Sequence, residues 1–176
     1  MFNPHGSTYL EPNRPQNEED KTMTDIGDSI PPVALTRPDG SSVSAADYDG
    51  KAWVLYFYPK DDTTGCTKEA QEFSAQLAAF EAAGVDVLGV SKDPPKKHVK
   101  FIEKYALTVP LASDAETDGL AEAMGVWIEK SMYGKKYMGM DRSTFLIGKD
   151  GKVVRVWRKV KVAGHVDEVL AAAQAL

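Results

Sequence analysis

The chain has 176 residues, of which 43% are hydrophobic and 27% are charged, and its formal net charge at pH 7 is -5. This composition suffices for one hydrophobic core, and it argues against a nucleic-acid-binding surface, because phosphate binding requires clustered Lys and Arg. No apolar run approaches the roughly 18 residues that a membrane-spanning helix needs, so we expect no membrane-bound form.

The use of cysteine indicates a reducing compartment. The chain contains a single Cys, Cys66, which cannot form an internal disulfide, and no Cys/His cluster has the spacing of a zinc site. The sequence also begins without the apolar stretch of a signal peptide. We therefore expect a soluble cytoplasmic protein with one free thiol and no metal.

The first 24 residues differ in composition from the rest of the chain. They hold three of the ten prolines, are rich in Asn, Glu and Asp, and show neither helical nor strand periodicity. We expect residues 1–24 to be a disordered extension, and residues 25–176 to form one folded domain.

Strand and helix patterns alternate after this extension. Two apolar runs of strand length, residues 53–58 and 85–90, predict buried neighbouring strands. Between them an apolar stripe that includes Phe73 and Phe80 recurs at helical spacing, and Gly84 marks the expected end of the helix. The order strand, helix, strand predicts a parallel crossover unit.

The second half of the chain continues this order. A second helix is expected over residues 93–106, which begin with Asp-Pro-Pro. Residues 143–157 predict two strands joined by a turn at Asp150-Gly151, and residues 165–176 predict a final helix. A crossover unit followed by a hairpin and a terminal helix predicts an α/β protein with a thioredoxin-like fold, in which helices flank a central mixed β-sheet.

Cys66 lies where the first strand gives way to the helix. In the first turn of a helix, unpaired backbone N–H groups and the positive end of the helix dipole favour a thiolate. The neighbours Thr63, Thr64 and Gly65 are small and polar, although the acidic pair at 61–62 would oppose the thiolate. Cys66 is therefore a candidate nucleophile that needs a cationic partner; a small buried hydrophobe is the commonest alternative role of a lone Cys.

The segment FYPKDDTTGCTKEA resembles the active-site segment of peroxiredoxins, specifically the Q type, also called bacterioferritin comigratory protein. The motif of that family is Pro, three residues, Thr, two residues, Cys, and Pro59, Thr63 and Cys66 match its spacing. The resemblance extends over about residues 25–176 and assigns the family's active-site Arg to Arg142 in MDRSTFLI. It implies a thioredoxin fold and a thiol-dependent reduction of peroxides without metal or organic cofactor, by a protein that is commonly a monomer.

The resemblance also implies a role for each matched residue. The Cys66 thiolate attacks a peroxide oxygen and becomes a sulfenic acid. The Thr63 hydroxyl and the Arg142 guanidinium donate hydrogen bonds to the charge that develops, and Arg142 is also the cationic partner of the thiolate. Pro59, which has no N–H and a fixed φ, shields the sulfur and shapes the pocket.

Other interpretations of these residues stay open. Thr63 could cap the helix, Arg142 could belong to a surface ion pair, and Pro59 could simply end the strand. His98 matches a His in similar sequences, but its Lys-rich helix predicts a solvated residue rather than a base. Six apolar residues could line a substrate mouth, with core packing expected for most of them: Trp127, Met132, Tyr133, Tyr137, Met138 and Met140.

Gln71 determines how the reaction cycle must end. Many Q-type members carry a resolving cysteine at this position, and no other Cys in the chain can replace it. The sulfenic acid then requires an external thiol, such as thioredoxin, glutathione with glutaredoxin, or another small thiol. The alternative function is a redox sensor that passes oxidation to a partner protein; a disulfide oxidoreductase is disfavoured because Cys-x-x-Cys is absent.

Overall fold

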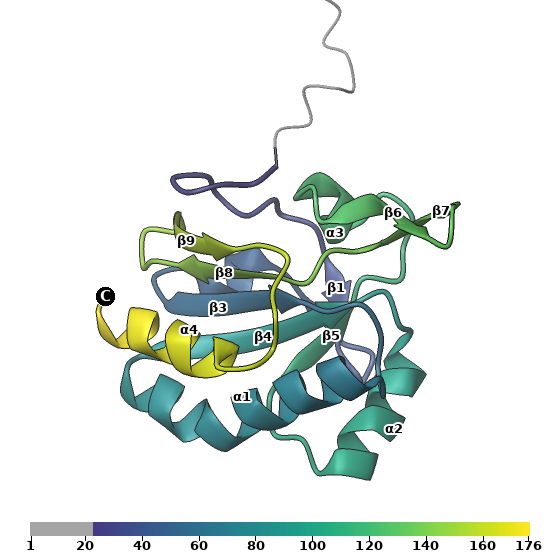
Figure 1. Cartoon of the computed structure of the whole chain (residues 1–176). Coiled ribbons are helices and arrows are strands. Elements are labelled where there is room, and N and C mark those ends of the chain that lie inside the picture. Colours follow the sequence, from purple (N-terminus) through teal and green to yellow (C-terminus); the bar gives the residue numbers. More distant parts are fainter. Residues whose placement is uncertain (1–22) are drawn as a thin grey trace, which may run out of the picture.

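The computed structural model describes residues 23–176 of the chain (Figure 1). Its elements are β1 (Leu35–Thr36), β2 (Ser42–Val43), the 3-10 helix η2 (Ala45–Tyr48), β3 (Ala52–Phe57), α1 (Thr64–Ala82), β4 (Val85–Ser91), α2 (Pro95–Tyr105), β5 (Leu111–Ser113), α3 (Leu120–Ala123), β6 (Trp127–Met132), β7 (Lys135–Met140), β8 (Ser143–Ile147), β9 (Val153–Trp157) and α4 (His165–Gln174).

Residues 1–22 of the extension expected over residues 1–24 lie outside the described residues. Of its last two residues, Met23 is exposed, whereas Thr24 is buried and its amide donates a hydrogen bond to the Met124 carbonyl at 3.1 Å. Residue 24 therefore packs with the folded part of the chain.

A mixed sheet forms the centre of the molecule, as the sequence predicts. Its seven strands run in the order β2-β1-β5-β4-β3-β8-β9. Strands β3, β4 and β5 are parallel to one another, whereas β1 and β8 pair with their neighbours in the antiparallel sense. Helices α1, α2 and α4 cover one face of the sheet, and α3 with the β6–β7 hairpin lies on the other side (Figure 1).

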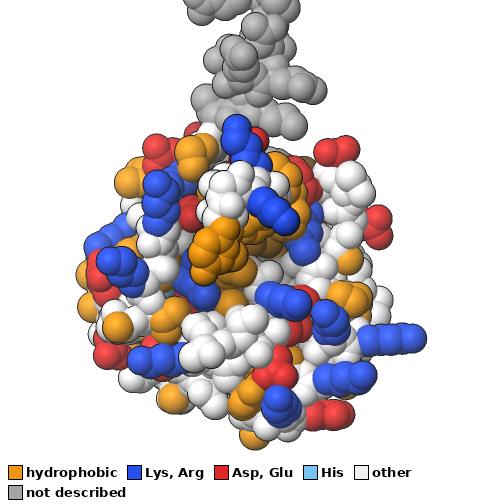
Figure 2. Space-filling view, turned by 45° about the vertical axis from the view of Figure 1, so that its right-hand side comes forward, with side chains coloured by type: hydrophobic (Ala, Val, Ile, Leu, Met, Phe, Trp, Pro, Cys, Tyr) orange, Lys and Arg blue, Asp and Glu red, His pale blue; other side chains and the backbone are white. Residues whose placement is uncertain are grey.

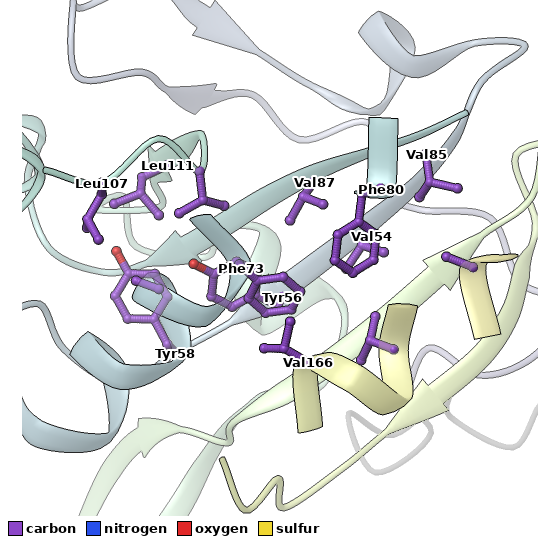
Figure 3. Packing of buried hydrophobic residues seen from close by; sticks show 14 of the residues in the cluster. Val54, Tyr56, Tyr58, Phe73, Phe80, Val85, Val87, Leu107, Leu111 and Val166 are labelled. Carbon is purple, nitrogen blue, oxygen red and sulfur yellow. The ribbon is translucent and has the colours of Figure 1, made fainter. Parts of the chain in front are cut away.

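Alternation along β3 divides the core into two clusters. Val54, Tyr56 and Tyr58 belong to the cluster beneath α1 and α4, together with Phe73 of α1 and Val166 of α4 (Figure 3). The intervening side chains of β3 point to the opposite face and join a second cluster. A strand that is buried on both faces explains the continuous apolar run of the sequence.

The elements that the sequence analysis did not predict are short or exposed. Strands β1, β2 and β5 span only two or three residues each. The β6–β7 hairpin forms a separate two-stranded sheet. Among residues 23–176, no helix combines the length and the apolar character that crossing a bilayer requires.

Candidate active site

Cys66 occupies the first turn of α1, at the carboxyl ends of the parallel strands. Helix α1 begins at Thr64, and Thr63 is its N-cap residue with an extended backbone (φ -94, ψ 157). The first amide groups of a helix have no partner inside the helix and point toward its N-terminal end. Cys66 is only 1% exposed, so the structure shows a thiol that is both buried and placed at a helix N-terminus.

Arg142 reaches this thiol from the neighbouring part of the sheet. Strand β8 pairs with β3, and the pairing of Phe57 with Ser143 carries Arg142, the residue before β8, toward the start of α1. Its Nη2 lies 3.2 Å from the Cys66 Sγ. A Cβ at Gly65 would approach that same Nη2 to 3.2 Å, so the absence of a side chain there leaves room for the guanidinium.

Glu69 is a residue of this site that the sequence analysis missed. Its Oε1 accepts a hydrogen bond from Arg142 Nη1 at 2.7 Å, while its side chain is completely buried. The other oxygen, Oε2, has no hydrogen-bond partner among the described residues. Burial raises the pKa of Glu69 to about 7, an effect that Arg142 partly offsets. One guanidinium therefore bridges a thiol and a carboxyl group that are one turn apart on α1.

Glu69→Gln should remove one contribution to the dependence of stability on pH. An unfolded Glu ionises near 4.5, whereas burial holds the folded pKa near 7, so stability that is present below 4.5 is lost as the pH rises through about 7. This difference corresponds to about 3 kcal/mol. Burial lowers the pKa of His165 to about 4, which gives an opposite contribution that both proteins share. Chemical denaturation between about pH 4.5 and about pH 8 should therefore show the free energy of unfolding of the wild type falling relative to that of the variant.

Glu81→Gln, which changes an exposed carboxylate on the same helix, serves as the control and should follow the wild-type curve. If Glu69→Gln also followed that curve, Glu69 would titrate as an ordinary surface residue.

Thr63 and Pro59 lie on the exposed loop that leads into α1. The Thr63 side chain makes no capping hydrogen bond, so the alternative of a side-chain helix cap is wrong. Its Oγ1 instead donates to the Lys60 carbonyl at 2.9 Å. The hydroxyl proton is thereby committed, and the oxygen lone pairs remain available as acceptors.

The two acidic residues of this loop are each compensated by partners. The Asp61 carboxylate is buried and accepts hydrogen bonds from Tyr58 and His98. The Asp62 side chain points outward, where its Oδ2 accepts a hydrogen bond from the Lys104 Nζ at 2.8 Å. Its other carboxylate oxygen accepts a hydrogen bond from the Tyr105 hydroxyl. The opposition to a thiolate that the sequence suggested is therefore reduced at both positions.

The prediction that His98 is solvated is wrong. Its side chain is fully buried, because the residue lies on the same face of α2 as Phe101. The neighbouring lysines on α2 are exposed, and they concealed this buried face in the sequence.

Core packing is also wrong for most of the hairpin residues. Met140 is buried and Trp127 is half-buried, and the two pair directly at the base of the hairpin. Four other side chains are 43–98% exposed: Met132, Tyr133, Tyr137 and Met138. The reason is that β6–β7 extends from the core as a separate sheet. Figure 2 brings this side of the molecule forward and shows hydrophobic side chains around a hollow, with Lys and Arg around it.

A buried thiol at a helix N-terminus, hydrogen-bonded to an arginine on a thioredoxin-like fold, defines the class of thiol peroxidases. Comparison with known proteins agrees with this class. A profile described as the AhpC/TSA family matches residues 26–156. The chain therefore belongs to the AhpC/TSA family, and within it to the Q-type peroxiredoxins, whose relatives and solved structures it matches along most of its length.

Two curated relatives illustrate this similarity. Peroxiredoxin Bcp of Xanthomonas campestris is 45% identical over 157 residues, which cover 87% of this chain and 98% of the relative. Peroxiredoxin Bcp of Bacillus subtilis is 48% identical over 146 residues, which cover 83% of this chain and 92% of the relative.

Solved structures give the same result. Peroxiredoxin Q of Xanthomonas campestris matches with a TM-score of 0.79 at 43% identity, covering 88% of this chain and 98% of that one. A cysteine-to-serine mutant of peroxiredoxin Q from Xylella fastidiosa matches with a TM-score of 0.82 at 40% identity. This match covers 88% of the present chain and 98% of the Xylella fastidiosa chain. The predicted thioredoxin-like peroxiredoxin fold and thiol peroxidase activity are thereby confirmed. Two further Xanthomonas campestris structures are mutants of cysteines at two different positions. That relative therefore carries at least two cysteines, whereas this chain has one.

Proposed function

We propose that this peroxidase reduces hydrogen peroxide and organic hydroperoxides through Cys66 alone, and that an external thiol completes each cycle. The observation that carries the proposal is the 3.2 Å contact between Arg142 and the sulfur of the sole cysteine. One structure of the Xanthomonas campestris relative is named for its alkyl peroxide reduction activity. The exposed apolar side chains of the hairpin, which leads through Asp141 to Arg142, support a similar substrate here.

In the first step, the Cys66 thiolate attacks one peroxide oxygen. An S–O bond forms, the O–O bond breaks, and the departing oxygen takes a proton to leave as water or an alcohol. Complete ionisation of the thiol is worth only about 2 kcal/mol over an ordinary one at neutral pH, so most of the acceleration comes from preorganised hydrogen bonds. The Arg142 guanidinium and the first-turn amides of α1 supply the donors.

Thr63 and Pro59 hold the substrate at the sulfur. Because the Thr63 hydroxyl donates to Lys60, its oxygen accepts a hydrogen bond from the peroxide O–H rather than donating one, which revises the role expected from the sequence. Pro59, two residues after the end of β3, shields the thiol from water. This step requires neither a metal nor an organic cofactor.

In the second step, an external thiol attacks the sulfenic acid. A mixed disulfide forms and water leaves; a second thiol then releases the Cys66 thiolate and a disulfide product. Thioredoxin, glutathione with glutaredoxin, or another small thiol would supply these equivalents. A monomer in the reducing cytoplasm would meet all of them, and this location is part of the proposal. Turnover of peroxide with excess small thiol separates this enzyme from a sensor, which would oxidise once and stop.

Wild-type protein should be inactivated by excess peroxide and form no internal disulfide. Residues 66 and 71 lie on one regular helix, in which five residues separate the Cα atoms by about 8.7 Å, more than the roughly 7 Å that a disulfide tolerates. More directly, the chain has no second Cys, so the sulfenic acid waits for an external thiol and oxidises further to sulfinic acid in excess peroxide. Mass spectrometry after peroxide treatment without thiol measures this outcome.

Gln71→Cys tests whether α1 can open. If it opens, a disulfide between Cys66 and the introduced thiol appears, and the variant resists inactivation. If α1 stays helical, the new thiol remains free and the inactivation rate is unchanged. Gln71→Ser is the matched control without a second thiol. Wild-type protein that resisted overoxidation, or turned over without added thiol, would contradict the one-cysteine cycle.

A further inference from the structure

His98 is a buried titratable residue that the peroxidase chemistry above does not use. Its Nδ1 lies 2.6 Å from the Asp61 Oδ2, and its Nε2 lies 3.1 Å from the Ala112 carbonyl oxygen. The ring therefore joins three elements: α2, which carries it, the loop before Cys66, and β5.

Asp61 is the one residue of the segment from 59 to 63 that turns into the interior. The other four residues of this segment are exposed. Its second carboxylate oxygen accepts a hydrogen bond from the Tyr58 hydroxyl at 2.6 Å, and its amide donates to Asp93 at 2.8 Å. The contact between Thr63 and the Lys60 carbonyl closes the turn around it. The position of this turn, and of the helix start that follows it, therefore depends on what holds Asp61.

The contacts of His98 satisfy both sides of its ring. Nδ1 faces the Asp61 carboxyl group and Nε2 faces the Ala112 carbonyl, so each ring nitrogen has a hydrogen-bond partner. Three polar groups face this pair: the hydroxyl of Tyr58, the residue after β3; the Asp93 carboxylate; and the Ala112 carbonyl of β5. The Asp93 carboxylate also accepts a hydrogen bond from Ser91 and lies 3.9 Å from the Lys97 ammonium. The buried pair of His98 and Asp61 therefore has a hydrogen-bond partner for each of its facing atoms.

We propose that His98 is a positioning residue for the peroxidase reaction: through its Nδ1 it holds Asp61, and through Asp61 it fixes the turn that presents Thr63 and Cys66 to the peroxide. This inference rests on the proposed chemistry of Thr63 and Cys66. Loss of the Nδ1 donor releases the turn from α2, so the sulfur and its hydrogen-bonding partners lose their alignment. Misplacement of about 1 Å at a reacting centre can cost two orders of magnitude in rate.

Two amide substitutions separate the two contacts of the ring. His98→Asn keeps an N–H near the position of Nδ1, and therefore the contact with Asp61. His98→Gln keeps an N–H near the position of Nε2, and therefore the contact with the Ala112 carbonyl. Each variant loses one buried hydrogen bond, so both should lower the melting temperature to a similar extent. The second-order rate constant with hydrogen peroxide should fall about tenfold in His98→Gln and less than about threefold in His98→Asn.

Three further measurements complete the test. Lys100→Gln, on the exposed side of α2, is the control and should leave the rate unchanged. Nitrogen-15 NMR should show that both ring nitrogens of His98 are hydrogen-bonded, through signals that vanish in both His98 variants. Hydrogen exchange of the amides in the segment from 61 to 67 should accelerate in His98→Gln and not in His98→Asn.

Equal rates in the two folded variants, or an Nδ1 without a hydrogen bond, would overturn the proposal. The exchange and NMR measurements do not require peroxide turnover. A wild-type protein without peroxidase activity would therefore contradict the proposed function while still testing whether His98 holds the turn.

Discussion

Cys66→Ser is expected to reduce peroxide consumption to the uncatalysed background. The serine hydroxyl is not ionised at neutral pH, and its oxygen cannot take up the peroxide oxygen as sulfur does in forming a sulfenic acid. The chain offers no second thiol to replace it. Peroxide consumption with excess small thiol measures the loss.

The folded state of this variant is the necessary control. Serine is close to cysteine in size, so the core beneath α1 should remain packed, although a hydroxyl then lies in a site that is 1% exposed. The Arg142 guanidinium lies within reach of that hydroxyl. A cooperative thermal transition with lost activity supports the assignment, whereas retained turnover would remove Cys66 from the mechanism.

Arg142→Lys is expected to cost about 100-fold in the rate constant with peroxide, and clearly less in the rate of thiolate alkylation. Lysine preserves the positive charge but loses the planar pair of donors that reaches both Cys66 and Glu69. A single ammonium can still stabilise the thiolate electrostatically. It cannot donate in a fixed geometry to the departing peroxide oxygen while it also compensates the buried carboxyl group.

Two measurements on the same protein distinguish these contributions. The pH dependence of alkylation by an uncharged reagent reports thiolate formation, and stopped-flow mixing with hydrogen peroxide reports the peroxidase step. Arg155→Lys, which changes an exposed arginine paired with Glu168, is the matched control. Equal losses in alkylation and peroxide reduction would mean that Arg142 acts only on the ionisation of the thiol.

The sequence predicts the central part of this fold because its physical signals are local. The runs at 53–58 and 85–90 are apolar without interruption, and they form β3 and β4, which pair in parallel. The strand pair from 143 to 157 likewise follows from its alternation and its turn. The β6–β7 hairpin was misread because an apolar side chain does not itself reveal whether another element packs against it.

The site was predictable where a motif fixes the spacing. Cys66 and Arg142 were assigned from a resemblance, and the structure brings them together although 76 residues separate them. Glu69 could have been found, since it lies three residues after Cys66 and therefore on the same face of the helix.

His98 offered a similar signal that the surrounding lysines obscured. Together with Phe101, Ile102 and Tyr105 it completes a stripe at helical spacing on α2. Its partners Asp61 and Ala112 are distant in the sequence, so the network around the ring required the structure.

The most direct test of the account is mass spectrometry of wild-type protein after one equivalent of peroxide, with a sulfenic-acid trapping reagent present. The account predicts a single trapped adduct on Cys66, no disulfide within or between chains, and disappearance of the adduct when an external thiol is added before the trap. A disulfide-linked dimer, or an oxidised residue other than Cys66 as the main product, would contradict a one-cysteine peroxidase that relies on an external reductant.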